Sequence, residues 1–248
     1  MLLNEKIFTH FQNEAKQAVV DQIYLGLGYT CVTLTNGNCG LCYTPKEPSG
    51  NCTVFKDPQD YEGTSAELLL DRIHSKKPLD RCLAIAAANA LNQNYAITVP
   101  EDTADIDVTL HLHSGDQVAM VGYFAPIVEH LKKKGIFVQA FDIGKQVGEE
   151  EAFYTWAKAN ADALVLTATS LITNSTEAVF DKLGFKNIPS VLMGMSTIVA
   201  PDLYDHLGIH FCAGAAPVDV PATIKAIRNG RGTPYIHKHT KKILLQLS

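Results

Sequence analysis

Ligands for soft metals are concentrated at the start of the chain, where four of the six cysteines fall within the first 52 residues. Cys39 and Cys42 have the Cys-x-x-Cys separation of a zinc or iron knuckle, although no second Cys-x-x-Cys follows them. If this segment is an extended strand, side chains three residues apart point to opposite faces, which opposes chelation. Cys31 and Cys52 complete a four-thiolate site only if the surrounding hairpin and loop fold together. The alternative is that these cysteines are small buried side chains.

Histidines supply further pairs of potential metal ligands. His111 and His113 would place two imidazoles on one face of a strand, because side chains two residues apart in a strand point the same way. None of the histidine pairs has an evident carboxylate partner, so each is also consistent with ordinary polar residues at a surface or an edge. The sequence contains no Walker, nucleophile-elbow or His-Glu-x-x-His pattern. No established catalytic motif therefore assigns a reaction.

Residues 101–248 are predicted to form a Rossmann-like, doubly wound α/β domain. Continuous apolar segments alternate with helical ones, which is typical of a parallel sheet covered on both faces. The predicted strands span residues 118–123, 136–143, 163–169, 190–195 and 209–214. Pro126 fits the first turn of a helix, and Gly135, Gly184 and Gly208 fit helix ends.

Ligands of such sheets bind at the carboxyl ends of the strands, near the point where the strand order reverses. The candidates at those ends are Gly122, Tyr123, Phe124, Asp142, Thr169, Gly194, Ser196 and Gly214. Asp142 lies 20 residues after Gly122, the offset at which a dinucleotide fold places its ribose-binding acid. The other two glycines of that fingerprint are missing, so we do not expect a conventional NAD site. Tyr123 and Phe124 would instead stack on a flat ring or pack the seam between two domains.

The helix after the third predicted strand offers a second type of binding feature. Asn174 is expected to be its N-cap, with Glu177 three residues later completing a capping box. A helix start rich in N–H and O–H donors is also a ready anion site. Ser175 and Thr176 are therefore candidate ligand contacts if they face a cleft.

Residues 1–100 are predicted to form a small α+β domain with an antiparallel sheet. Its expected elements are a helix over 4–18 capped by Asn4, an alternating strand over 21–34, a hairpin at Asn36–Gly37, a loop over 46–60, a Thr64–Glu67 capping box and a helix over 79–92. A change of pattern near residue 100 places the domain boundary there.

Composition restricts the partners. A net charge of −5 gives no general electrostatic reason to bind nucleic acid or an anionic membrane. No apolar run approaches the roughly 20 residues that span a bilayer, and the N-terminus has no signal-peptide core. We therefore expect a cytoplasmic protein, with its oligomeric state open and a homo-oligomer included.

Five segments together resemble a known family. They are GLGYT at 26–30, AAANAL at 86–91, VAMVGYFAPIVEHLKKKG at 118–135, TATSLITNSTEAVF at 167–180 and VLMGMSTIVAPDLYDHLGIHFCAG at 191–214. The chain resembles, over nearly its whole length, the prokaryotic family of unknown function described as "putative heavy-metal chelation". That resemblance implies an enolase-N-terminal-like domain followed by a Rossmann-like domain, with the working site in the cleft between them.

The resemblance also implies site residues. It points to Asn89 in the first domain. In the second domain it points to Gly122, Tyr123, Phe124, Thr169, Asn174, Thr176, Gly194, Ser196 and Gly214. Family members tend to have Gly-Pro-Ser or Gly-Pro-Thr after the fourth strand, whereas this chain has Gly194-Met195-Ser196. The matched positions are mostly hydroxyls, amides and glycines, which are poor ligands for soft metals. Asn89 has a second interpretation, in which its amide satisfies a buried carbonyl.

Three functions remain open on this basis. The first is a binding or chelation protein that captures a small molecule or a metal complex, with a transition metal among the candidate ligands. The second is an enzyme acting on a small metabolite with a nucleoside-type cofactor, such as S-adenosylmethionine or a nucleotide, with Asp142 on the ribose. The third is a structural or regulatory partner of another enzyme.

Overall fold

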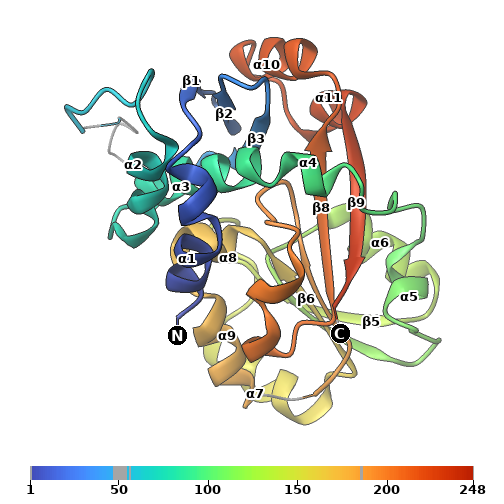
Figure 1. The fold of residues 1–248 in the computed structure, drawn as a ribbon. Coiled ribbons are helices and arrows are strands. Elements are labelled where there is room, and N and C mark those ends of the chain that lie inside the picture. The colour runs from blue at the N-terminus through green and yellow to red at the C-terminus, as the bar shows by residue number, and fades with distance from the viewer. Residues whose placement is uncertain (1, 47–54, 56, 185–186, 248) are drawn as a thin grey trace.

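The computed structural model describes residues 2–46, 55, 57–184 and 187–247, and Cys52 lies outside them. The chain builds two β-sheets (Figure 1). The smaller is antiparallel, in the order β1 (Val20–Leu25), β2 (Tyr29–Leu34), β3 (Cys39–Tyr43). The larger has the order β5 (Phe137–Phe141), β4 (Gln117–Val121), β6 (Ala163–Thr167), β7 (Ser190–Met193), β8 (Phe211–Pro217), β9 (Thr240–Gln246). The predicted α/β fold class is confirmed.

The large sheet is parallel from β5 to β8, and its last strand, β9, is antiparallel to β8. Strand β9 is not among the strands predicted from the sequence. The strand order reverses between β4 and β6, so the carboxyl ends of these two strands flank the topological switch point.

Helices cover both faces of the large sheet. The second half contains α5 (Ile106–Thr109), α6 (Ala125–Lys133), α7 (Glu150–Asn160), α8 (Thr169–Thr173), α9 (Thr176–Leu183), α10 (Val220–Arg228) and α11 (Thr233–Ile236). Val118 and Met120 of β4 pack with residues of α6, whereas Ala119 packs with residues of α7 on the other face. Helix α10 instead packs on β1 and β2 of the small sheet (Figure 1).

The first half is organised around one central helix. Its helices are α1 (Leu3–Ala15), α2 (Ala66–Leu70), α3 (Pro78–Leu91) and α4 (Gln93–Ala96), with a 3₁₀ turn over Asp71–His74. Nearly every residue of α3 is buried, as expected for a helix enclosed on all sides. Gly40 shows how closely β3 approaches this helix: a Cβ placed there would lie 2.1 Å from the Ala86 oxygen and the Ala90 nitrogen.

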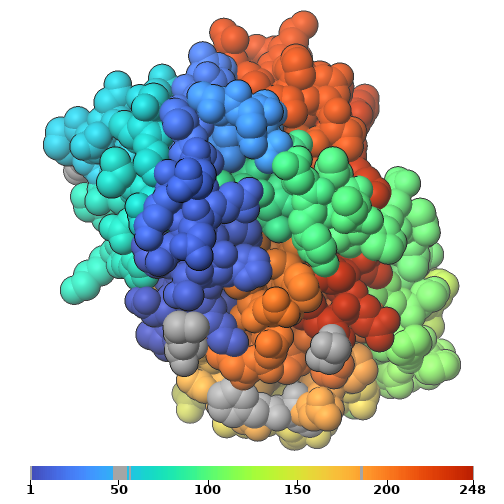
Figure 2. Space-filling model, viewed as in Figure 1, coloured from blue at the N-terminus to red at the C-terminus, as the bar shows by residue number. Residues whose placement is uncertain are grey.

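Hydrogen bonds join the two halves along α3 and α4. Asn92 Nδ2 donates to the Val199 oxygen at 2.8 Å, and Gln93 Nε2 donates to the Pro217 oxygen at 2.7 Å. In the space-filling view, the blue and green surface of the first half adjoins the orange and red surface of the C-terminal segments (Figure 2). The boundary at residue 100 stays a prediction. In the part of the chain that the structure describes, no helix has the length and apolarity to span a bilayer.

Several local predictions are corrected. The run over 21–34 is two antiparallel strands, because the chain turns back at residues 26–28. Leu2, not Asn4, occupies the N-cap of α1, and the Asn4 amide donates to the Ile73 oxygen. The N-cap of α2 is Ser65, whose Oγ accepts from the Glu67 N–H. The Asn36–Gly37 turn does join β2 to β3, with Gly37 at φ +89°.

Candidate functional site

Gly122 sits at the switch point, directly after β4. Its φ of +89° suits only glycine comfortably, and a Cβ there would lie 2.6 Å from Thr167 Cβ at the end of β6. The turn is therefore filled by neighbouring protein. Tyr123 and Phe124 are half-buried and pack against the apolar cluster beneath α6. Both aromatic residues therefore have a structural role in this turn.

Asp142 holds two loops together at the same edge. Its Oδ2 accepts from the Tyr123 N–H at 2.8 Å, and its Oδ1 accepts from the Lys145 N–H at 3.0 Å. The Lys145 ammonium lies 3.9 Å from Oδ2 and donates to the Tyr123 oxygen. Each carboxylate oxygen thus accepts a backbone N–H, which gives Asp142 a structural role in joining the two loops, and its role toward a ribose stays a prediction.

The helix start after β6 differs from the prediction. Asn174 is the left-handed C-cap of α8, at φ 54°, and Ser175 is the N-cap of α9 without a side-chain capping bond. The Thr176 hydroxyl is buried and donates to Ser170 Oγ at 2.9 Å. Glu177 reaches across to α1, where its Oε1 accepts from the Leu3 N–H at 2.6 Å. The expected capping box is wrong because Glu177 caps a different helix. Thr169 pairs locally with Thr167, the two hydroxyl oxygens being 3.1 Å apart.

The remaining residues carried over from the family lie in a packed seam. The Asn89 amide donates to the Leu41 oxygen at 2.9 Å, and Ser196 Oγ accepts from the Tyr43 N–H at 2.9 Å. Gly194 N–H donates to the Ala213 oxygen, and a Cβ on Gly214 would lie 2.7 Å from Val199 Cγ2. A crevice lined in part by Asn89 has about 10 Å³ of water-sized space, about enough for one water molecule.

The structure does not bring Cys39 and Cys42 together. Both lie on β3, three residues apart, and their thiols enter different apolar clusters. Cys39 Sγ lies 3.2 Å from Cys31 Sγ, whereas Cys42 Sγ lies 3.5 Å from Ser196 Oγ. The predicted knuckle is therefore corrected, for the reason that an extended strand alternates its side chains.

His111 and His113 do not share a strand face. Both are exposed and precede β4 in a turn, and His111 has a left-handed φ of 54°. Side-chain alternation requires extended backbone, which this segment lacks. The predicted imidazole pair is corrected accordingly.

A different set of ligands does converge, between α5 and α6. Oxygen or nitrogen atoms of Asp105, Asp107 and His130 all lie within 4.8 Å of one another. His130 Nε2 is 2.6 Å from Asp107 Oδ1 and 3.9 Å from Asp105 Oδ2. Asp107 is buried, His130 is partly exposed and Asp105 faces solvent. The sequence separation of 23 positions from Asp107 to His130 explains why no local motif revealed this cluster.

The local charges are balanced by a lysine. Lys134 follows α6, and its ammonium lies 3.0 Å from Asp107 Oδ2. The hydrogen bond from His130, offset in part by burial and reinforced by Lys134, lowers the pKa of the Asp107 carboxyl below its usual range. Asp107 is therefore ionised at neutral pH and available as an anionic ligand.

Asp107→Asn is expected to destabilise the protein at pH 7 by about 1–2 kcal/mol, because charge-assisted hydrogen bonds from His130 and Lys134 are lost. Because the folded pKa is depressed, the stability from Asp107 is present above its unfolded pKa of about 3.9 and is lost as pH falls through the folded value. Urea unfolding from pH 7 to pH 3 should show the difference between the two proteins shrinking below about pH 4. Asp105→Asn is the exposed control, and a difference that stayed constant with pH would contradict the expectation.

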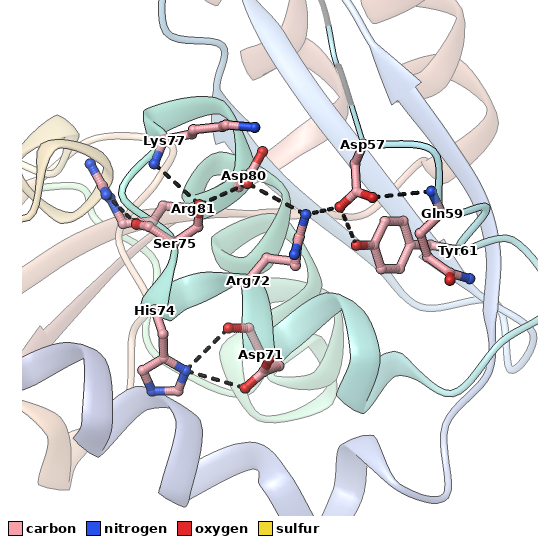
Figure 3. Close-up of polar contacts among 10 residues, drawn as sticks. All are labelled: Asp57, Gln59, Tyr61, Asp71, Arg72, His74, Ser75, Lys77, Asp80 and Arg81. Atoms are coloured by element: carbon pink, nitrogen blue, oxygen red, sulfur yellow. Dashed lines mark hydrogen bonds and ion pairs between the residues drawn. The ribbon is translucent and has the colours of Figure 1, made fainter.

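A separate charged network lies at the corner between α2 and α3 (Figure 3). Arg72 lies between the carboxylates of Asp57 and Asp80, and the Tyr61 hydroxyl donates to Asp57 at 2.8 Å. Ser75 Oγ donates to Asp80 at 2.7 Å. These contacts join the segment before α2 to the start of α3, so we assign the network a structural role rather than a ligand-binding one.

Comparison with known proteins places the chain in a family. A family model described as "putative heavy-metal chelation" (DUF364) matches residues 104–246, and a second with the same description (DUF4213) matches residues 8–92. The chain belongs to this family. The family resemblance in the sequence is confirmed, and the two matched ranges together cover both halves of the fold.

Solved structures of the family share the fold. A protein of unknown function from the DUF364 family of Pyrococcus horikoshii superposes with a TM-score of 0.81 at 18% identity, over 99% of this chain and 100% of that one. One from Desulfitobacterium hafniense DCB-2 gives 0.80 at 15% identity, over 98% and 97%. An uncharacterized protein of Methanocaldococcus jannaschii is 22% identical over 174 residues, which is 68% of this chain and 67% of the relative.

Proposed function

We propose that this protein binds a divalent transition-metal ion through Asp105, Asp107 and His130. The observation that carries the proposal is the convergence of two carboxylates and one imidazole, with ligand atoms within 4.8 Å of one another. The family description, heavy-metal chelation, supports the same class of function. Carboxylate oxygen with imidazole nitrogen suits the harder ion Mn²⁺ and borderline ions such as Co²⁺, Ni²⁺ and Zn²⁺ better than soft ones.

The geometry needs a small opening to hold such an ion. Two ligand atoms that share a metal at about 2.1 Å stand roughly 3.0–3.4 Å apart. The His130 Nε2 to Asp107 Oδ1 separation of 2.6 Å would therefore widen by less than about 1 Å as the ion replaces the shared proton. Asp105 is exposed and can close over the ion from the solvent side. The remaining coordination positions would take water or donor atoms of a chelating small molecule.

Lys134 is the internal competitor for the ion. Its ammonium supplies positive charge to Asp107 before a metal arrives, and its side chain is half exposed and can swing into solvent. A divalent ion neutralises both carboxylates, so Lys134 becomes an unfavourable neighbour once the ion is bound. Removing a ligand such as Asp107 should therefore lower the metal affinity, whereas removing the Lys134 charge should raise it.

Isothermal titration of the full-length protein with Zn²⁺ and Mn²⁺ tests the proposal. We expect Asp107→Asn and His130→Gln each to weaken binding by at least about 100-fold, since each removes a ligand. Lys134→Met should strengthen binding several-fold, on the order of 1 kcal/mol, because a competing cation is removed. His113→Gln, in an exposed histidine 3.8 Å from Asp116, is the matched control. Unchanged affinity in both ligand variants would rule out the site.

The interdomain cleft implied by the family resemblance stays a prediction. The seam residues Asn89 and Ser196 are engaged in bonds to the protein backbone. An organic ligand there would have to displace those bonds or part the two halves. The carboxylate–imidazole cluster requires neither change, which is why the proposal rests on it.

A further inference from the structure

Two buried cysteines meet across the small sheet. Cys31 of β2 and Cys39 of β3 have their sulfurs 3.2 Å apart, and neither side chain is exposed to solvent. The pair lies far from the carboxylate–imidazole cluster in the fold, on the sheet of the first half beneath α10 and α11 (Figure 1). Neither the family comparison nor the proposed metal site uses these thiols.

The register of the sheet disfavours a disulfide between them. Cys31 is opposite Leu41, and Cys39 is opposite Thr33, so the two cysteines are diagonal neighbours. Diagonal Cα atoms stand about 7–8 Å apart, whereas a disulfide normally spans about 4.4–6.8 Å between Cα atoms. A bridging atom between the sulfurs relieves this mismatch, because it lengthens the link.

The surroundings of the pair are apolar. The same cluster contains Leu41, Met195, Ile227 and Ile236, none of which carries a charge. The hydrogen bond with Cys39, together with burial, raises the pKa of the Cys31 thiol well above its usual range. Two adjacent thiols in an apolar pocket suit a strongly thiophilic ion better than an oxygen-seeking one.

We propose that Cys31 and Cys39 form a dithiol site for one soft divalent metal ion of low coordination number. In the binding step each thiol loses its proton to solvent and each sulfur forms one bond to the ion. Two thiolates and a divalent ion make a neutral unit, which an apolar pocket accepts. A monovalent ion would leave a buried net negative charge, which is strongly disfavoured. Ions that prefer oxygen ligands bind weakly to two thiolates.

The distances are compatible with this step. Metal–sulfur bonds of about 2.3 Å put two sulfurs about 3.8 Å apart in a tetrahedral arrangement and about 4.6 Å apart in a linear one. From 3.2 Å, the pair would open by roughly 0.6–1.4 Å, within reach of small side-chain rotations. The Met195 thioether lies in the same cluster and provides a further soft group.

The C-terminal helices pack over the cluster that contains the pair. Helix α10 packs on β1 and β2, and the Tyr29 hydroxyl of β2 lies 2.6 Å from Thr233 Oγ1 of α11. Because both thiols are fully buried, the packing around them must open locally before an ion reaches them. Binding is therefore expected to be slow, and the bound ion to strengthen the contact.

Native mass spectrometry of the reduced, full-length protein after one equivalent of Hg²⁺, with excess glutathione as competitor, tests the site. We expect wild type to gain one mercury and lose two hydrogens. Cys31→Ala and Cys39→Ala should each hold mercury at least about 100-fold less tightly, because the second thiol supplies the chelate effect. Cys42→Ala and Cys212→Ala are matched controls, since both thiols are also buried.

The outcomes separate this site from the carboxylate–imidazole cluster. Asp107→Asn should retain mercury, and Cys31→Ala should retain the Zn²⁺ affinity of wild type. Alkylating and mapping the cysteines of the unfolded, mercury-loaded wild type needs no variant, and Cys31 and Cys39 should be the two protected positions. Mercury retained in Cys31→Ala, protection at other cysteines, or a loss of two hydrogens without metal would each overturn the proposal.

Discussion

Gly40→Ala is expected to destabilise the protein by about 3 kcal/mol or more, at the upper end of overpacking effects. The new Cβ would lie 2.1 Å from the Ala86 oxygen and the Ala90 nitrogen. Both atoms belong to the backbone of α3, which cannot rotate away as a side chain can. Either β3 or the central helix must move, and α3 is buried against both halves of the protein.

Gly28→Ala is the matched control, because a Cβ at Gly28 meets nothing within 4 Å. It should change the free energy of unfolding by no more than about 0.5 kcal/mol. Urea unfolding followed by circular dichroism measures both variants. Equal midpoints for the two would mean that β3 does not lie as close to α3 as the structure places it.

Arg81→Met is expected to cost about 3 kcal/mol of stability. Arg81 is 6% exposed, and its Nε donates to the Ile172 oxygen of α8 at 2.5 Å. A terminal nitrogen also donates to the Ser75 oxygen (Figure 3). Methionine retains the apolar part of the side chain. The loss of stability therefore comes from the Ile172 and Ser75 carbonyls, which lose a cationic hydrogen-bond donor.

Arg231→Met provides the comparison for Arg81, because Arg231 is exposed and stacks 4.8 Å from the centre of the Tyr235 ring. Its effect should stay within about 0.5 kcal/mol. Hydrogen exchange should also quicken in α8 for the Arg81 variant, since this bond ties α8 to the first half. A shift in Arg81→Met no larger than in the control would show that the bond contributes little.

The two proposed metal sites divide by ligand type. Carboxylate oxygen and imidazole nitrogen favour borderline divalent ions, whereas paired thiols favour soft ones. A family description of heavy-metal chelation is compatible with either chemistry. Variants at Asp107 and Cys31 distinguish them, since each should affect one class of ion and leave the other unchanged.

Sequence alone determined the elements whose signals are local. Apolar runs alternating with helical segments predicted the parallel strands β4 to β8, and Asn36–Gly37 predicted the turn between β2 and β3. Pro126 and Gly184 marked a helix start and a helix end, because each restricts its own backbone. These features depend on side chains within a few residues of one another.

Only the tertiary structure decided which polar groups meet. The Cys-x-x-Cys spacing indicated a metal site shared by Cys39 and Cys42. The alternation of side chains along β3 separates these two thiols, and the pairing of β2 with β3 brings Cys39 next to Cys31. The spacing of Asn174 and Glu177 predicted a local cap, yet Glu177 caps α1. Asp107 meets His130 because α5 and α6 lie together beside β4. Long-range partners depend on how elements pack, and packing energy is spread over many apolar contacts that no short motif records.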